Sequence, residues 1–298
     1  MEPGFLMTIC TCDREGIEDV GVGVPQSAYP ALRAQCRKPH PVYDRDGVRL
    51  YVGDCLEVLP TLDQVDHVIT DPPYSPRAMK NYRSANMIQR RDGQIKDFGY
   101  AGITDALRSA VLHESARLAR RWVLIWTDIE SAHLWREGGQ EHGLRYIRTG
   151  VWVREHGAPQ FSGDRPAQGV EACYIGHAAA SKLKWNGGGH PAYWIGPIVN
   201  SQAEQQRIHS SPKPLWLMLQ LIEDFTNPGE TILDSFGGSM TTAVACKMLG
   251  RKCIAIEKEE RWVKVGIKRL DATPVPLFVT SVQAIERGQA ALPLEVGT

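Results

Sequence analysis

The chain has 298 residues, of which 43% are hydrophobic and 23% are charged, and this ordinary globular composition excludes wholesale disorder. Its 34 basic and 34 acidic residues give a formal net charge of zero, so it lacks the basic excess of a histone-like DNA coat, and any nucleic-acid contact must use a local patch. No apolar run approaches the roughly 18 residues of a membrane span, and the first residues do not form a secretory signal. Seven cysteines without disulfide-type spacing, three of them in apolar segments, favour reduced thiols and a cytoplasmic protein.

Three regions are expected along the chain. Residues 1–48 are rich in proline, glycine and polar residues, which indicates an irregular N-terminal extension, and its cysteines match no common zinc spacing, so we expect no metal site. Residues 49–270 are expected to form one catalytic domain, and residues 271–298 a C-terminal tail.

Short β-branched runs alternate with helical spacing between residues 49 and 270, which predicts an α/β doubly wound sheet. The expected strands are 49–52, 65–70, 122–127, 145–154, 170–176, 231–233 and 253–256. The expected helices are 104–119, one from about 129, one that begins at an N-cap Ser211 with Pro212 in its first turn, and one that ends near Gly250.

Four acidic residues each stand at the end of a predicted strand: Asp54, Asp71, Asp234 and Glu257. In open α/β sheets, ligands bind in the crevice outside the carboxyl ends of the strands. Helix capping would account for one or two such acids, whereas four of them beside a glycine-rich loop favour a binding site.

The glycine-rich loop is Asp234-Ser-Phe-Gly-Gly-Ser-Met-Thr-Thr, and it follows a predicted strand. Glycines allow close approach of a ligand to backbone N–H groups at a helix start. Glu257 ends the next strand, and an acid about 20 residues beyond such a loop binds the hydroxyls of a ribose. The loop therefore predicts a nucleoside ligand, while the absence of G-x-G-x-x-G and of G-x-x-x-x-G-K-[ST] argues against a nicotinamide cofactor and against ATP hydrolysis.

A second motif, Asp71-Pro72-Pro73-Tyr74, follows the predicted strand 65–70. Each proline fixes φ near about −65° and removes a backbone donor, so the carbonyls of the turn remain as acceptors. A carboxylate beside such a carbonyl offers two acceptors to one NH₂ group, and Tyr74 offers a flat face for stacking. The alternative is a rigid surface turn with no chemical role.

Together these motifs resemble the S-adenosylmethionine-dependent amino-methyltransferases of DNA, which carry [DNS]-P-P-[YFW] as the catalytic motif and D-P-F-x-G-S-G-T-T as the cofactor loop. The catalytic motif comes first here, as in the beta class of that family. Further matches are Gly53-Asp54-Cys55-Leu56, His209-Ser-Ser-Pro-Lys-Pro214 and Ile254-Ala-Ile-Glu257. The resemblance covers residues 49–270 and implies a mixed sheet of the class I methyltransferase (Rossmann-like) type, circularly permuted, with a small target-recognition insertion.

The resemblance also implies site residues. Asp71, Pro72, Pro73 and Tyr74 would be catalytic. The cofactor site would comprise Asp54, Cys55, Lys213, Asp234, Phe236, Gly237, Gly238, Ser239, Thr241, Thr242 and Glu257. For the DNA contacts, the charge pattern itself favours a basic loop at 75–100, with Arg77, Lys80, Arg83, Arg90, Arg91 and Lys96. The glycine- and aromatic-rich segment at 181–208, with Lys182, Lys184 and Trp185, is the candidate target-recognition region. Double-stranded DNA is the implied partner, and homodimers are frequent in this class.

Two residues depart from the family pattern. Met240 stands in place of the second glycine of F-x-G-x-G, so its side chain must point away from the pocket or narrow it, and Ser235 replaces the usual proline. Trp152 and Arg154, near the predicted strand 145–154, are expected to have a structural role.

The expected reaction is methylation of the N6 amine of an adenine that has been flipped out of the duplex. Asp71 and the Pro72 carbonyl would accept the two N–H groups of the amine, and Tyr74 would stack on the base. Three alternatives remain at this point: methylation of cytosine N4, methylation of protein glutamine or RNA, and a non-catalytic binding protein that keeps the fold. Aspartate in the first motif position favours adenine, and the position of the cofactor loop downstream of the catalytic motif disfavours the second alternative.

Overall fold

The computed structural model describes residues 39–76, 78, 102–155, 163–198 and 212–275. Its strands are β1 (Tyr43–Arg45), β2 (Val48–Val52), β3 (His67–Thr70), β4 (Trp122–Thr127), β5 (Leu144–Glu155), β6 (Val170–Ala178), β7 (Tyr193–Pro197), β8 (Thr231–Asp234) and β9 (Lys252–Glu257). Its helices are α2 (Cys55–Val58), α4 (Asp105–Leu118), α5 (Ala132–Glu141), α7 (Leu215–Phe225), α8 (Thr241–Met248) and α9 (Glu260–Ala272), with short 3₁₀ turns η2 (Leu59–Thr61) and η3 (Ile129–Ser131).

The strands form a single mixed sheet in the order β1-β2-β9-β8-β3-β4-β6-β5-β7. Five neighbouring strands, from β2 to β4 in that order, are parallel. β6 runs antiparallel to both β4 and β5, and β7 runs parallel to β5. Because β8 and β9 lie between β2 and β3, the carboxyl ends of β2, β9, β8 and β3 meet at one edge of the sheet.

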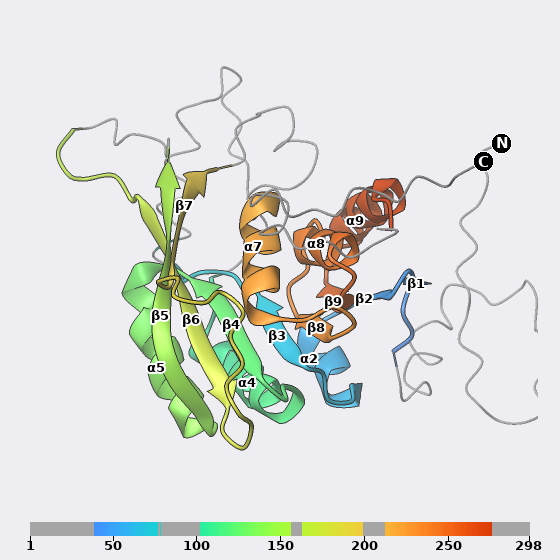
Figure 1. Cartoon of the computed structure of the whole chain (residues 1–298), viewed down its shortest axis with the longest axis horizontal. Coiled ribbons are helices and arrows are strands. Elements are labelled where there is room, and N and C mark those ends of the chain that lie inside the picture. Colours follow the sequence, from blue (N-terminus) through green and yellow to red (C-terminus); the bar gives the residue numbers. More distant parts are fainter. Residues whose placement is uncertain (1–38, 77, 79–101, 156–162, 199–211, 276–298) are drawn as a thin grey trace, which may run out of the picture.

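Helices cover both faces of the sheet, as the alternation of strands and helices predicts (Figure 1). On one face, α7, α8 and α9 pack on strand residues such as Ile69, Leu124 and Ile232. On the other face, α2, α4 and α5 pack on the alternate residues of the same strands, such as Val68 and Val123. The central strands are buried on both sides, and this explains their continuous apolar sequences.

The structure differs from the sequence-based expectations at three element boundaries. Residues 43–45, expected to be irregular, form the edge strand β1, which pairs with β2 through a turn at Asp46 and Gly47. The helix expected from Ser211 begins at Leu215, because a residue that precedes a proline is disfavoured in helical conformation and Pro214 is the N-cap. Helix α9 was not predicted, and it continues to Ala272, past the expected end of the domain.

The cysteines that the structure describes, Cys55, Cys173, Cys246 and Cys253, are buried free thiols. Three of them are the cysteines that the sequence places in apolar segments, so that prediction is confirmed. No helix in the described part of the chain combines the length and the apolar character that a bilayer crossing requires.

Candidate functional site

The four acids at the predicted strand ends lie along one edge of the sheet. Asp54 follows β2, Asp71 follows β3, and Asp234 and Glu257 are the last residues of β8 and β9. These strands are hydrogen-bonded neighbours in the order β2-β9-β8-β3. The two motifs, at residues 71–74 and 234–242, are therefore brought to the same edge of the sheet, where open α/β sheets bind ligands in a crevice.

A hydrogen-bonded threonine joins the glycine-rich loop to the predicted catalytic turn, residues 71–74, which is called the catalytic turn below. The Thr70 hydroxyl, at the end of β3, donates to Asp234 Oδ1 over 2.8 Å and accepts the Ser235 N–H over 3.1 Å. Thr70, Asp234 and Ser235 are all buried. Thr70 immediately precedes Asp71, so the two halves of the site are held in a fixed relation by one side chain that the sequence analysis did not single out.

The glycine-rich loop is organised by the two acids at its sides. Asp234 Oδ1 also accepts the Phe236 N–H over 3.1 Å, and Glu257 Oε2 accepts the Gly238 N–H over 2.8 Å. The other oxygen of Glu257 accepts the Glu259 N–H over 2.7 Å. Burial raises the pKa of both Asp234 and Glu257 above the ordinary values. Each ionised oxygen has two lone pairs, so Glu257 keeps acceptor capacity for ribose hydroxyls beyond these bonds.

Met240 points away from the crevice and into the core. Its backbone has φ 65° and ψ 32°, the left-handed conformation at which a glycine costs least, and its side chain is completely buried. A Cβ atom built on Gly266 of α9 would lie 2.3 Å from Met240 Cγ, so the methionine occupies space that exists because residue 266 is glycine. The departure from the family pattern is accommodated on the far side of the loop.

Helix α9 holds the same loop by a second contact. Arg269 donates to the Ser239 carbonyl and hydroxyl and to the Thr241 hydroxyl, the last two over 3.1 Å each. The predicted cofactor residues Ser239, Thr241 and Thr242 are all buried. Ser239 and Thr241 therefore serve to fix the loop on α9.

Asp54 and Cys55 lie at the outer end of the same edge. Asp54 caps α2 by accepting the Leu56 N–H over 3.0 Å, and its other oxygen accepts Lys258 over 2.9 Å, so its pKa is lowered. Cys55 is buried, and burial raises the pKa of its thiol to about 12, so it is a neutral apolar side chain. The two residues are next to the strand that carries Glu257, where the resemblance places the cofactor adenine.

Two hydrogen bonds hold the C-terminal end of the predicted catalytic turn, at the peptide group that joins Tyr74 to Ser75. The Ile103 N–H donates to the Tyr74 carbonyl over 3.0 Å, and the Ser75 N–H donates to Asp128 Oδ2 over 3.1 Å. Asp128 follows β4, the next parallel strand, and it is buried. It is a fifth acid at this edge of the sheet, and the sequence offered the same signal for it as for the other four.

Lys213 lies against Asp71 and Tyr74 of the predicted catalytic turn. Its ammonium donates to Asp71 Oδ2 over 2.6 Å and to the Tyr74 hydroxyl over 2.9 Å, and it lies 3.2 Å from Glu171 Oε2. These three contacts use the three N–H groups of an ammonium. The structure directs the ammonium to Asp71 and Tyr74, because Pro212 and Pro214 hold the segment extended before α7 begins. The assignment of Lys213 to the cofactor stays a prediction.

Asp71 has one occupied and one available oxygen. Oδ2 bonds Lys213, whereas Oδ1 is buried and has no hydrogen-bond partner among the residues that the structure describes. Burial raises the pKa of Asp71 to about 6, although Lys213 opposes this effect. At neutral pH the carboxylate is therefore ionised and presents one free acceptor atom.

Glu171 of β6 and Arg154 of β5 complete a buried group of charges. Glu171 Oε2 accepts the Tyr74 hydroxyl over 2.6 Å, and Glu171 Oε1 accepts Arg154 over 3.3 Å. Arg154 was expected to be structural, and Glu171 was missed. A single acid inside an otherwise apolar strand was the signal available in the sequence, because a buried charge requires a partner.

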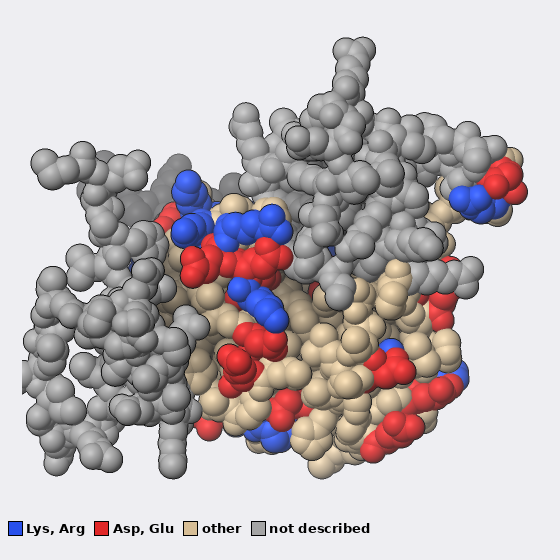
Figure 2. Space-filling model, turned by 180° about the vertical axis from the view of Figure 1, so that it is seen from behind, with Lys and Arg blue, Asp and Glu red and all other residues tan. Residues whose placement is uncertain are grey.

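The predicted DNA-contact residues Arg77, Lys80, Arg83, Arg90, Arg91 and Lys96 lie outside the described residues. The described surface drawn in Figure 2 has basic side chains next to acidic ones. Ion pairs such as Arg45–Asp271 and Arg261–Glu259 are examples of this mixed character.

The residues Lys182, Lys184 and Trp185 lie at the opposite edge of the sheet from Asp71. The Lys184 carbonyl accepts the indole N–H of Trp122, the first residue of β4, and Trp185 packs on Phe225, the last residue of α7. The catalytic turn is next to the other end of β4, roughly 16 Å away along the strand. The structure therefore does not bring these three residues to the catalytic turn, since β6 carries the chain to the amino ends of the parallel strands.

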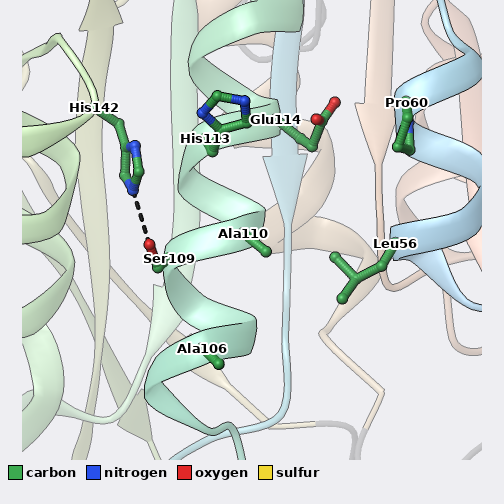
Figure 3. A pocket seen from close by; sticks show the side chains of 8 residues that line it. All are labelled: Leu56, Pro60, Ala106, Ser109, Ala110, His113, Glu114 and His142. Atoms are coloured by element: carbon green, nitrogen blue, oxygen red, sulfur yellow. Dashed lines mark hydrogen bonds between the residues drawn. The ribbon is translucent and has the colours of Figure 1, made fainter.

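A separate groove lies between α2 and α4. It has a volume of about 500 Å³ and is lined by Leu56, Pro60, Ala106, Ser109, Ala110, His113, Glu114 and His142. Figure 3 shows the Ser109 hydroxyl hydrogen-bonded to His142 at its wall. None of the four catalytic-turn residues lines this groove, and no group of metal-binding side chains occurs in the described residues, so the strand-end crevice remains the candidate site.

Comparison with known proteins agrees with this geometry. Residues 177–268, which include Lys213, the glycine-rich loop and Glu257, match the model of the N6/N4 methyltransferase family, described as DNA methylase. This part of the chain, about a third of it, is thus similar to that family. The chain is 24% identical over 259 residues to the type II methyltransferase M2.DpnII of Streptococcus pneumoniae, covering 78% of this chain and 92% of that protein. It is also 24% identical over 245 residues to M.HinfI of Haemophilus influenzae, covering 73% of this chain and 67% of that protein.

Solved structures share the fold of this chain. The complex of M1.HpyAVI with S-adenosylmethionine superposes with a TM-score of 0.60 at 24% identity, covering 75% of this chain and 99% of that one. The cytosine-N4-specific PvuII DNA methyltransferase superposes with a TM-score of 0.62 at 16% identity, covering 84% of this chain and 93% of that one. The prediction of a class I methyltransferase sheet is thus confirmed.

Proposed function

We propose that this protein transfers a methyl group from S-adenosylmethionine to the N6 amine of adenine in double-stranded DNA. The observation that carries the proposal is Asp71, whose free Oδ1 and neighbouring Tyr74 stand beside the glycine-rich loop. The match of residues 177–268 to the N6/N4 methyltransferase family and the names of the relatives support the reaction class and the DNA substrate.

The residues of the crevice fit S-adenosylmethionine as the methyl donor. Glu257 would accept the ribose hydroxyls, Asp54 and Cys55 would border the adenine, and Phe236 lies half-buried at the loop between them. Gly237 and Gly238 carry no side chain, so the loop backbone is open to close approach. S-adenosylmethionine supplies an electrophilic methyl group on a sulfonium.

Asp71 would activate the target amine by hydrogen bonding. The amine lone pair is delocalised into the base, and an N–H bond to Asp71 Oδ1 with a second to the Pro72 carbonyl localises it on nitrogen. Holding donor and acceptor in line contributes on the order of 7–11 kcal/mol in well-oriented reactions. Lys213 keeps Asp71 ionised and oriented, so the carboxylate acts first in positioning and then as the acceptor of the departing proton.

A base in a duplex reaches this crevice only when it is flipped out of the stack, which costs a few kcal/mol. Stacking on Tyr74 returns roughly 1–3 kcal/mol of that cost. The 75–100 segment follows Tyr74 directly and is proposed to hold phosphates through its basic residues. A homodimer and a cytoplasmic location remain predictions from the sequence, the latter supported by the buried free thiols.

Cytosine N4 is the second candidate, because a cytosine-N4-specific enzyme has the same fold. Both amines fit one carboxylate and one carbonyl. Aspartate in the first position of the catalytic motif favours adenine by resemblance to the family.

The test is methyl transfer from labelled S-adenosylmethionine to defined duplex DNA, followed by chromatography of the nucleosides. We expect label in N6-methyladenine, and label in N4-methylcytosine would support the second candidate. The Asp71→Ala variant should lose transfer while calorimetry still shows cofactor binding. Equal labelling of protein and DNA, or retained turnover by Asp71→Ala, would contradict the proposal.

A further inference from the structure

The inference concerns Glu171, which the sequence motifs do not mark. It is the second residue of β6, between Val170 and Ala172, and its side chain is only 9% exposed. In the sheet it is paired with Trp152 of β5, two strands away from the catalytic turn at the end of β3. A buried carboxylate in an apolar strand is costly unless it is paired, so its contacts indicate what it does.

Among the residues that the structure describes, Glu171 contacts Tyr74 of the catalytic turn, Lys213 beside it, and Arg154. Oε2 accepts the Tyr74 hydroxyl over 2.6 Å and lies 3.2 Å from the Lys213 ammonium. Oε1 accepts Arg154, whose side chain is 10% exposed. Burial disfavours ionised Glu171, but Lys213, the Tyr74 hydroxyl and Arg154 together hold its pKa below the usual range. Glu171 is therefore a fixed anion that faces Tyr74.

Hydrogen bonds hold Tyr74 at its backbone and at its hydroxyl, and its ring packs against the core. The preceding prolines fix the backbone of the turn, whereas the ring could still rotate about its side-chain bonds. The bond to Glu171 fixes the far end of the ring. The Lys213 ammonium lies 5.1 Å from the ring centroid, and it lies 5.6 Å from the Trp126 ring, so it sits against one face of Tyr74.

We infer that Glu171 is a positioning residue for methyl transfer: it anchors the Tyr74 hydroxyl and Lys213, and through them it sets the orientation of the stacking ring and of Asp71. This inference rests on the proposed function and deepens it. Arg154 supports Glu171 from the next strand. Neither residue touches the reacting atoms, so their effect appears in the rate of the chemical step and its pH dependence.

The test is a double-mutant cycle between Glu171→Gln and Tyr74→Phe. Glutamine keeps the size of Glu171 but removes its charge. Phenylalanine removes from Tyr74 only the hydroxyl that donates to Glu171. Each variant should lower kcat about tenfold or more, since a hydrogen bond to a charged group is lost, while KM for S-adenosylmethionine changes less than twofold. Because both substitutions break the same contact, the double variant should be about as slow as the slower single variant.

The pH dependence separates positioning from a purely structural role. Glu171 is a negative charge near Asp71 and helps to raise the pKa of Asp71. Glu171→Gln should therefore move the acidic midpoint of the kcat profile to lower pH. The titration of Asp71, followed by carbon NMR of labelled aspartate without substrate, should move in the same direction.

Glu230→Gln is the matched control. Glu230 also accepts hydrogen bonds from a cationic partner, Arg121, and contacts the ring of His67. It directly precedes β8, at the opposite end of that strand from Asp234. This variant should lower the melting temperature without moving the pH midpoint. Should Glu171→Gln fail to fold, Tyr74→Phe and Glu171→Asp, which shortens the reach to the hydroxyl, carry the same test.

An unchanged kcat and an unchanged Asp71 titration in Glu171→Gln would overturn the inference. The inference would also be overturned if Glu171→Gln lowered kcat by the same factor in the wild-type and Tyr74→Phe backgrounds. Failure of the proposed function is distinguishable, because the wild-type protein would then transfer no methyl group to DNA. In that case the substrate-free titration of Asp71 still decides whether Glu171 controls it.

Discussion

Gly266→Ala should destabilise the protein because the new methyl group collides with Met240. An ideal Cβ on residue 266 lies 2.3 Å from Met240 Cγ and 3.1 Å from Met240 Cβ. Met240 cannot move aside easily, since it is fully buried and its Cε lies 2.7 Å from the position of a Cβ on Gly237. The side chain is thus enclosed between α9 and the glycine-rich loop.

The expected magnitude follows from two opposing effects. Overpacking of a filled core costs up to about 3 kcal/mol. Replacement of a mid-helix glycine by alanine in α9 contributes about 1 kcal/mol in the other direction. The net loss of about 2 kcal/mol corresponds to a decrease in Tm of roughly 4–8 °C for a protein of this size class. Displacement of the loop should also weaken the binding of S-adenosylmethionine.

The assay is thermal unfolding of the wild type, Gly266→Ala, Met240→Gly and the double variant, with calorimetry of cofactor binding. In the Met240→Gly background the collision is absent, so Gly266→Ala should become stabilising by about 1 kcal/mol through helix propensity alone. Gly169→Ala is the control, because nothing lies within 4 Å of its Cβ. An equal destabilisation by Gly266→Ala in both backgrounds would refute the reasoning.

Three further predictions concern the strand-end crevice. Activity of the wild type should decrease as pH falls through about 6, because transfer requires ionised Asp71 and burial raises its pKa to about 6; a kcat profile that is flat down to pH 5 would contradict this. Lys213→Met should move that midpoint above 6, since the ammonium is the largest effect that lowers the Asp71 pKa. Asp71 would lose its cationic partner, which should cost about 3–5 kcal/mol of stability in denaturant unfolding; a midpoint at or below the wild-type value would contradict this prediction. Thr70→Val keeps the shape of the side chain but removes the hydroxyl between Asp234 and Ser235. It should lower the free energy of unfolding by about 1–3 kcal/mol and weaken cofactor binding in calorimetry. Unchanged affinity would show that Thr70 does not hold the two halves of the site together.

The position of the crevice was predictable because its signals are local. Asp71, Asp234 and Glu257 each come at the end of a short β-branched run, and the run and the acid are neighbours in the sequence. Strand ends of parallel neighbours must share an edge, so no distant contact had to be known. Asp128 follows the same rule and could have been found in the same way.

The contacts that set the chemistry were not predictable, because they depend on strand order and register. Glu171 reaches Tyr74 only because β6 lies beside β4 in the sheet, and the direction of Met240 depends on Gly266 in a helix that the sequence analysis did not predict. Trp185 shows the same limit in reverse. An aromatic side chain such as Trp185 suits base recognition, but the direction of β6 decides at which edge of the sheet Trp185 lies.

The strand order has a consequence for how the molecule is made. β2 and β3 leave the ribosome early, yet the two strands that separate them, β8 and β9, are synthesised almost at the end of the domain. Until then the nascent sheet contains a gap two strands wide, with unpaired edges on both sides, and loop closure over more than half of the chain must precede the last pairing. The strand-end site is therefore complete only after β9 has paired, and a chain truncated before β9 would lack Glu257 and the central part of the sheet.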